Sequence, residues 1–369
     1  MVVLFNHQSQ EIHFNEWIEL ITLCLAPLIA HIIAGVPSPT FLNPKRPRWH
    51  ERMGLFNPTS IIWRYFAIFD RRIRAKSWNA LDMAASNAVF WANKGWDGSE
   101  EMIRNSREYC LRQPARTHID FFSGTAAKTL IVTLQGFQAI YTLLLGITSP
   151  KSNKYANLMA FSYIFVPLAI FGLLRLPVAF WLAEDYSFAN FDTRETSDTS
   201  IESLQENEQK RAIASETEYS TTSLLGLDSV AEEDSFHSAN SWRGIAVRAF
   251  FLALLTPLWG ITLYYLSPSN GRVYTTTTLL INLFYLTFLT GTILILLIYF
   301  SCGVSRTTII PCVISVWYKV YTGFLLAFIV VIMIIAGLET RKTPCGTYTT
   351  YSSHSDRHLC PELFNLTSH

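Results

Sequence analysis

Residues 278–300 read TLLINLFYLTFLTGTILILLIYF, a run of 23 residues without a charged side chain. A helix rises about 1.5 Å per residue and needs roughly 20 apolar residues to cross the hydrocarbon core of a bilayer. This run therefore predicts a transmembrane helix. Five further stretches follow the same rule: 17–36, 129–148, 158–174 (extendable through Pro177 to Leu182), 247–266 and 320–338. The predicted fold class is all-α, a polytopic integral membrane protein with six transmembrane helices.

The Lys and Arg residues predict the orientation of these helices. Of 29 in the chain, segments 37–128, 175–248 and 301–319 hold 15, 6 and 2, and the remaining segments hold 6 together. Cytoplasmic loops retain an excess of positive charge. We therefore expect both termini to be exterior or lumenal, in the plasma membrane or an endomembrane of the secretory pathway. The first 16 residues lack the basic start and apolar core of a cleaved signal peptide, so 17–36 is expected to remain as an anchor.

The predicted spans divide the chain into regions of contrasting charge. The net charge is only +1, yet region 37–127 carries +6 and region 183–242 carries −11. The order is an exterior segment 1–16, span 17–36, a basic cytoplasmic loop 37–127, spans two and three in 129–182, an acidic cytoplasmic loop 183–242, spans four to six in 246–338, and an exterior tail 339–369.

The exterior tail carries two marks of an oxidising compartment. Cys345 and Cys360 bracket a Ser/Thr/Tyr-rich stretch, and Asn365 begins an Asn-Leu-Thr glycosylation sequon. A disulfide closing this loop would contribute about 3 kcal/mol by the chain-entropy estimate. The alternative is two free thiols and an unused sequon.

The basic loop predicts an amphipathic helix at 57–75. Asn57 followed by Pro58 is typical of a helix start. Ile62, Tyr65, Phe66, Phe69 and Ile73 fall on one face, while the arginines lie away from it. A helix this short, with four arginines, suits the inner membrane interface rather than a span. The predicted interface residues are Arg64, Phe66, Phe69, Arg71 and Arg74, with anionic inner-leaflet lipids of the bilayer as partners.

Neighbouring features of this loop support two interpretations. The loop contains five of the chain's ten tryptophans, which suits the interface, namely Trp49, Trp63, Trp78, Trp91 and Trp96. A second helix is predicted at 78–93, with a face of small residues suited to close packing. The alternative is an ordinary cytosolic helical subdomain that covers the end of the bundle.

The acidic loop is poor in periodic apolar residues, which predicts disorder. Candidate phosphorylation sites, each with Glu three residues downstream, are Thr199, Ser203, Ser215 and Ser229. Such matches arise readily in a Ser/Glu-rich tract, so a solvated spacer is the alternative.

Few polar residues lie within the spans. His31 is the one deep ionisable residue, and it is interpreted as either functional or a hydrogen-bonded structural histidine. Lys128, Gln135, Gln138 and Thr142 share one helical face that should look into the bundle. Buried Gln and Thr commonly tie helices together, at about 0.6–2 kcal/mol per bond, and a solute path is the alternative.

No known catalytic, cofactor or metal signature stands out. His354 and His358 form a lone HxxxH between the exterior cysteines, and no GxSxG, CxxC or phosphate-cradling glycine loop occurs. The leading hypothesis is a non-enzymatic protein that recruits or regulates cytoplasmic protein partners through its loops, without nucleic acid. The alternatives are a small-solute transporter or channel, supported by prolines at similar depth in spans one and four, and a membrane-embedded enzyme acting on a lipophilic substrate.

Overall fold

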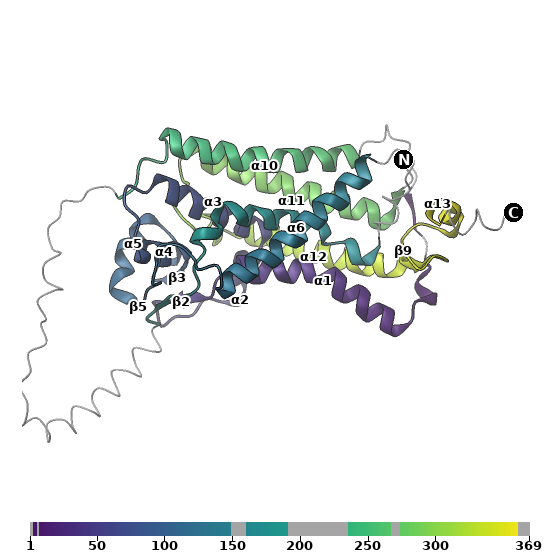
Figure 1. The fold of residues 1–369 in the computed structure, drawn as a ribbon, viewed down its shortest axis with the longest axis horizontal. Helices are drawn as coiled ribbons and strands as arrows, with labels where there is room; N and C mark the ends of the chain where they lie inside the picture. The colour runs from purple at the N-terminus through teal and green to yellow at the C-terminus, as the bar shows by residue number, and fades with distance from the viewer. Residues whose placement is uncertain (1–2, 6, 149–159, 191–234, 267–273, 361–369) are drawn as a thin grey trace, which may run out of the picture.

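The computed structural model describes residues 3–5, 7–148, 160–190, 235–266 and 274–360. This part of the chain is mostly helical, and five helical segments are long and apolar enough to cross a membrane. They run side by side along the long axis of the molecule (Figure 1). The five are α1 (Phe14–Gly35), the stretch Phe161–Trp181, α10 (Trp242–Leu266), α11 (Thr276–Ser301) and α12 (Val316–Glu339). The chain is therefore an integral membrane protein.

The second predicted span, 129–148, lies within α6 (Gly124–Thr148), which is not one of these five segments. α6 crosses the bundle obliquely (Figure 1). Two glycines set how closely it packs on the stretch Phe161–Trp181. A Cβ on Gly136 would lie 2.6 Å from Leu173 Cγ, and one on Gly172 would lie 2.3 Å from Val132 Cγ1. Small residues at these points let the two backbones approach.

The third span is irregular because of its prolines. It consists of η4 (Phe161–Tyr163), α8 (Val166–Gly172) and η5 (Leu173–Trp181). Pro167 sits in the first turn of α8, and Pro177 lies inside η5, where it cannot donate a backbone hydrogen bond. The apolar segment continues past Pro177 to Trp181, which agrees with the predicted extension toward Leu182.

The two ends of the bundle are built differently (Figure 1). Both termini lie at one end, which we call the disulfide end. Here β1 (Val3–Leu4) pairs with β7 (Tyr274–Thr275), and β8 (Arg341–Lys342) pairs with β9 (Tyr348–Thr349). Short helical turns complete this end, namely η1 (Ser9–Glu11), η8 (Ser353–Ser355) and α13 (Asp356–Leu359).

The opposite end, which we call the sheet end, carries a small α/β cap made mainly by residues 39–56 and 75–112. Its sheet has the order β2 (Pro39–Phe41), β3 (Val89–Ala92), β4 (Gly95–Asp97), with β2 parallel and β4 antiparallel to β3. The remaining elements are α2 (Trp49–Met53), η2 (Gly54–Phe56), α4 (Ala80–Asn87), α5 (Glu100–Asn105), η3 (Arg107–Tyr109) and β5 (Cys110–Arg112), which pairs with β6 (Ser187–Phe188).

The cap corrects the prediction of a second helix at 78–93. The helix α4 ends at Asn87, and the next residues form strand β3. The sequence of β3, VFWA, is β-branched and aromatic, which favours a strand. The chain then turns at Gly95, whose φ of 104° favours glycine, and returns as β4. The fold is thus mostly helical with a few short strands.

Helix α3 (Pro58–Arg74) lies between the spans at the sheet end and runs beside α10 (Figure 1). Trp63 and Phe66 are fully buried, and their rings contact Phe300 of α11. Phe66 also meets Phe251 of α10, with ring centroids 5.5 Å apart. An aromatic core of this kind stabilises the close approach of α3 to two spans.

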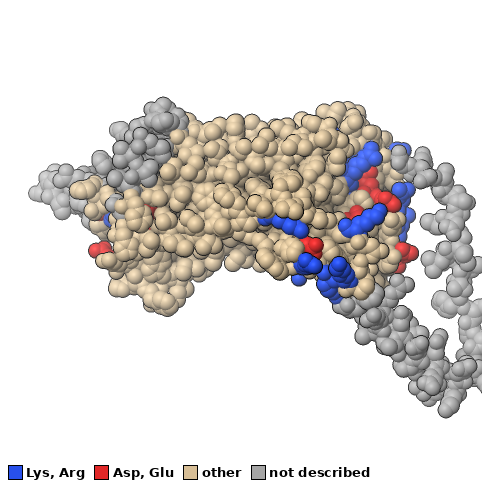
Figure 2. Space-filling view, turned by 180° about the vertical axis from the view of Figure 1, so that it is seen from behind, with Lys and Arg blue, Asp and Glu red and all other residues tan. Residues whose placement is uncertain are grey.

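The surface is consistent with a membrane-embedded middle. Figure 2 shows Lys and Arg gathered mostly toward the sheet end of one face, while the long central band carries neither sign of charge. Large apolar side chains are exposed along the helices of the bundle, including Leu130, Leu134 and Phe137 of α6. Exposed contiguous apolar surface on this scale requires a lipid or protein environment.

Candidate functional site: a cap joined to the bundle by buried arginines

Helix α3 begins where the sequence predicted, and its first turn is tied to two spans. Asn57 Oδ1 accepts a hydrogen bond from Thr59 N at 2.9 Å, and Pro58 follows as the first helical residue. Asn57 Nδ2 also donates to Thr322 Oγ1 of α12 at 2.9 Å, and the hydroxyls of Thr59 and Thr292 of α11 lie 2.8 Å apart. A helix cap that also bonds the neighbouring spans fixes both the start of α3 and its position.

This first turn lies well inside the bundle. Thr292 precedes Ser301, the last residue of α11, by nine residues, or about 14 Å of helix. At its other end α3 reaches the cap, where Arg74 Nη2 forms an ion pair with Glu100 of α5. Helix α3 therefore fills the sheet-end mouth of the bundle and continues into the cap.

Two arginines bind the end of α1. A helix leaves its last carbonyls without intrahelical partners, and burial makes such groups costly. Arg64 Nη1 donates to Gly35 O at 2.8 Å, and Arg175 Nη1 donates to Ala34 O. Arg175 Nε also donates to Thr129 Oγ1 of α6 at 2.7 Å. Three elements, α3, η5 and α6, are thereby fastened to the end of the first span.

Two more arginines connect α3 and α10 to the loop between α11 and α12. Arg71 is 2% exposed, and its Nη2 donates to Gly98 O at 2.7 Å and to Arg306 O at 3.0 Å. Burial lowers the pKa of Arg71 to about 10, so the group stays cationic at neutral pH. Arg248 of α10 donates to Phe300 O in the last turn of α11 at 3.1 Å and to Ser305 Oγ of the loop at 2.6 Å.

Arg74 is the centre of a buried ionic network. It is 1% exposed, and its Nε lies 2.7 Å from Asp70 Oδ2 while Nη2 pairs with Glu100 of α5. Burial raises the pKa of Asp70, and the neighbouring Arg74 opposes that rise. The network joins α3 to the cap through two fully buried charges, Asp70 and Arg74, and the partly exposed Glu100. Removing Arg74 would leave Asp70 as a buried charge without its partner.

These contacts correct the prediction that 57–75 lies at the membrane interface. The guanidinium groups of Arg64, Arg71 and Arg74 are enclosed by protein and donate mainly to backbone carbonyls, so they do not meet lipid headgroups. Phe66 is fully buried and Phe69 is partly buried against Trp181. The alternative prediction, a cap on the bundle, describes this region better.

The five tryptophans of the basic loop do not all lie at the surface, as a membrane-interface role would require. Trp63, Trp91 and Trp96 are buried in the protein, and Trp78 is half-buried. Large aromatic side chains are nevertheless exposed where α2, α6, α10 and α12 begin at the sheet end, namely Trp49, Phe121, Phe122, Trp242 and Trp317. Exposed aromatic residues at the ends of membrane helices are typical of the membrane–water interface. We call this set the sheet-end aromatics.

The predicted polar stripe on α6 does not point into the bundle as a whole. Gln138 is exposed, while Lys128, Gln135 and Thr142 are partly exposed. The buried face of α6 is instead made of mostly small residues, Thr125, Thr129, Val132, Gly136 and Ala139. Close packing on α8 and η5 needs small side chains, and that requirement outweighs the burial of the amides.

His31 is buried, as its depth in α1 suggested, at 2% exposure. Neither ring nitrogen has a hydrogen-bond partner among the described residues. The described residues therefore do not support the interpretation of His31 as a hydrogen-bonded structural histidine.

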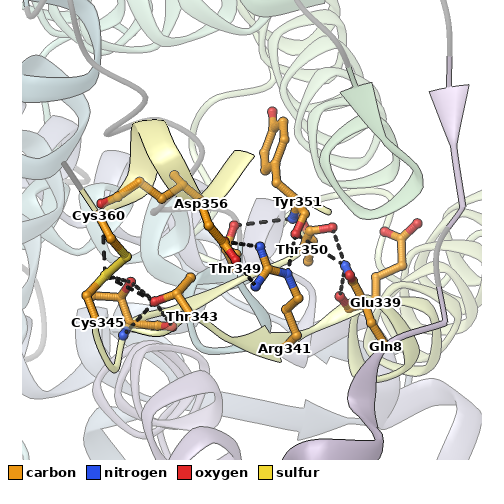
Figure 3. Close-up of polar contacts among 12 residues, drawn as sticks. Gln8, Glu339, Arg341, Thr343, Cys345, Thr349, Thr350, Tyr351, Asp356 and Cys360 are labelled. Atoms are coloured by element: carbon orange, nitrogen blue, oxygen red, sulfur yellow. Dashed lines mark hydrogen bonds and ion pairs between the residues drawn. A yellow bond between two sulfur atoms is a disulfide. The ribbon is translucent and has the colours of Figure 1, made fainter. Parts of the chain in front are cut away.

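The disulfide end holds the second polar cluster (Figure 3). Cys345 and Cys360 form the predicted disulfide, with their Cα atoms 5.8 Å apart. Arg341 forms an ion pair with Asp356 inside the loop that the disulfide closes, and its Nε donates to Tyr351 O at 2.7 Å.

The same cluster joins the two termini. Gln8 Nε2 donates to Glu339 O and to Thr350 O, both at 3.0 Å. The Glu339 carboxylate is fully buried and accepts from the backbone N–H groups of Thr276 and Thr277 at 3.2 and 2.8 Å. A carboxylate at the start of α11 satisfies orphan donors and favours the helix dipole.

Several sequence predictions lie outside the described residues. These are the glycosylation sequon at Asn365 and the phosphorylation candidates Thr199, Ser203, Ser215 and Ser229. In the described part of the chain, no three His, Cys, Asp or Glu residues gather so as to hold a metal ion.

Sequence reasoning missed Asp70, Glu100 and Glu339. One signal was available, because Asp70 and Arg74 are four residues apart and so face each other on a helix. Glu339 follows the last predicted span directly and reads as an ordinary interfacial acid. Its partners lie 62 and 63 residues earlier, at a distance that sequence pattern does not reveal.

Comparisons with known proteins identify no relative of this chain. No protein-family model, no curated protein and no solved structure matches this chain.

Proposed function

We propose that this chain is a non-enzymatic membrane protein that recruits or regulates cytoplasmic partners through its cap and its acidic loop. The position of α3 carries this proposal. A transporter or channel needs a solute path through the bundle, and α3 occupies the sheet-end mouth of that path. Its side chains bond α11 and α12 instead of facing water.

The volumes of two pockets, one of them beside α3, also favour the proposal. The space between the end of α1, α3 and residues 308–310 holds about 20 Å³, and the pocket between α6, α8, α10 and α11 holds about 80 Å³. Ligand sites for small molecules usually measure about 300–1,000 Å³. These two spaces are too small for a solute larger than a few waters.

The residues that flank the acidic loop on both sides are hydrogen-bonded to the cap and to α3. Before residues 191–234, Asn190 Oδ1 accepts from Phe41 N at 2.8 Å. After them, Ser235 O accepts from Lys76 N at 3.0 Å, and His237 N donates to Arg74 O at 2.8 Å. The residues on either side of 191–234 are therefore bonded to the cap and to α3, which suits partner recruitment by the cap and the acidic loop together.

We further propose six spans with both termini exterior or lumenal and the cap cytoplasmic. The termini lie at one end of the bundle (Figure 1), and this arrangement requires an even number of crossings, so α6 serves as the sixth span. The Lys and Arg excess at the sheet end supports a cytoplasmic cap. On this topology Asn365 is available for glycosylation, and the sheet-end aromatics lie at the inner leaflet with its anionic lipids.

Protease protection in sealed microsomes tests the topology. We expect a cleavable tag at the C-terminus to be protected and a cleavage site placed within 191–234 to be cut, because the microsome exposes its cytoplasmic face. Adding detergent should make both sites accessible. Cleavage of the C-terminal tag in intact microsomes would reverse the proposed orientation.

Locking α3 in place distinguishes recruitment from transport. Cysteines at Thr59 and Thr292, whose hydroxyls are 2.8 Å apart, should form a disulfide on oxidation, in a chain whose exposed Cys302 is changed to Ser. We expect the locked chain to keep its cytoplasmic partners, whereas removal of 191–234 abolishes their capture. Reconstituted vesicles should show no solute flux above empty vesicles, whether locked or reduced.

The matched control is Thr59→Cys alone, which cannot lock. Flux that stops on oxidation of the double variant and returns with reductant, but persists in the control, would make α3 a gate and replace the proposal with a transporter.

A further inference from the structure

A groove on the membrane-facing side of the bundle lies between α1 and α6. It has a volume of about 530 Å³ and is lined by α1 from Ile21 to Ala34 and by α6 from Lys128 to Val132. Ile21, Ile29 and Ile33 are each more than 40% exposed, so this face of α1 is not covered by the protein.

The length of the groove suits one lipid chain better than another transmembrane helix. Along α1 it covers 13 residue steps, about 20 Å. The hydrocarbon core is about 30 Å thick, and a partner helix would contact the bundle across all of it. On α6 the groove covers only four steps at the sheet end. An acyl chain that starts at the sheet-end leaflet fits this shape.

The chemistry of the groove changes along its length. Its lining is apolar except for Thr22 and Lys128, and Lys128 lies at the sheet end, where headgroups of that leaflet are found. Lys128 is 37% exposed and pairs with Glu184 at 2.7 Å. The ammonium group is thus partly open, with one carboxylate beside it.

Further positive charge lies behind that end of the groove. Arg175 bonds both walls, to Ala34 O of α1 and to Thr129 of α6, and is 1% exposed. Its Nη2 has no hydrogen-bond partner in the described part of the chain. Arg64 bonds the adjacent carbonyl of Gly35. Three cations therefore surround the end of α1, and Glu184 is the one carboxylate with an ion pair to any of them among the described residues.

We infer that the groove binds one anionic phospholipid of the sheet-end leaflet, with an acyl chain along α1 and its phosphate at Lys128. The excess of positive charge supplies the preference for an anionic headgroup, and the apolar wall supplies affinity for the chain. Glu184 competes with the phosphate for Lys128. The inference needs the protein to span a membrane, but it does not rest on partner recruitment.

Titration of the purified full-length chain in mild detergent tests this site. The probes are phosphatidylglycerol and phosphatidylcholine with identical chains, and bound lipid is counted by native mass spectrometry. We expect one molecule of phosphatidylglycerol to bind more tightly than phosphatidylcholine. Lys128→Gln should weaken phosphatidylglycerol about fivefold and leave phosphatidylcholine unchanged, whereas Glu184→Gln should strengthen phosphatidylglycerol.

Two further variants distinguish binding in the groove from a non-specific attraction of anionic lipid to positive charge. Lys319→Gln, at the sheet end of α12 and outside the groove, should leave both lipids unchanged. Ala30→Phe fills the groove and should weaken both lipids. Equal binding of the two lipids by the wild type, equal effects of Lys128→Gln and Lys319→Gln, or no effect of Ala30→Phe would each overturn the inference.

Discussion

Replacing Arg74 with Met should lower the free energy of unfolding by about 4 kcal/mol at pH 7, because it leaves the buried Asp70 carboxylate without its partner. Asp70 is fully buried, and its second oxygen has no hydrogen bond among the described residues. The measurement is an unfolding titration with SDS in mixed micelles.

The pH dependence of this variant identifies the mechanism. Asp70 faces Arg74, Arg248 and Glu100, and its pKa already lies above the ordinary 3.8 because of burial. Loss of Arg74 should raise it further. A carboxyl group with a higher pKa in the folded state binds its proton more tightly there, so stability falls as pH rises through the window between the two pKa values. The Arg74→Met variant should therefore regain stability as the pH is lowered from 7 toward 5.

The double variant Asp70→Asn, Arg74→Met is the matched control. It removes both charges and should recover much of the lost stability, with no dependence on pH in this range. Arg72→Met, on the partly exposed side of α3, should have a much smaller effect. A loss in Arg74→Met that is the same at both pH values would show that the ion pair with Asp70 is not its cause.

At the disulfide end, replacing Glu339 with Gln should cost about 3 kcal/mol, because a charged acceptor of two backbone hydrogen bonds becomes a neutral one with a competing donor. The N–H groups of Thr276 and Thr277 open α11, so the start of that helix should loosen first. Hydrogen exchange of these two amides, with the same SDS titration, measures the effect.

Glu19→Gln provides the control for Glu339→Gln. Glu19 lies on α1 at the same end of the bundle and is exposed, so the charge change is equal but no buried contact is lost. We expect exchange at Thr276 and Thr277 to be unchanged in this variant. Unchanged exchange in Glu339→Gln as well would mean that α11 does not depend on the carboxylate.

The spans could be predicted from the sequence because the hydrophobic requirement of a bilayer is local. The run 278–300 is long and apolar enough by itself to indicate a transmembrane helix, and α11 covers nearly the same residues. The disulfide could be predicted for a similar reason, since Cys345 and Cys360 are close in the sequence and lie in one predicted exterior segment.

The position of α3 could not be predicted from the same kind of pattern. An apolar stripe with arginines beside it describes an interfacial helix and a buried helix equally well. The difference lies in the carbonyls that receive the arginines, at Gly35, Gly98, His237 and Arg306. These acceptors are backbone carbonyls of distant segments. Every residue has such a carbonyl, so the sequence does not indicate which ones receive the arginines.

The order of synthesis gives these distant acceptors a consequence for biogenesis. Arg306 and the hydroxyls of Thr292 and Thr322 are made more than 200 residues after α3. At about 5–20 residues per second, the ribosome needs on the order of 10–50 s to supply them. During that interval α3 has its arginines but not all of their acceptors. A chain that stops before α11 can insert its first spans, but it lacks the carbonyl of Arg306 and the hydroxyls of Thr292 and Thr322 that hold α3 in place.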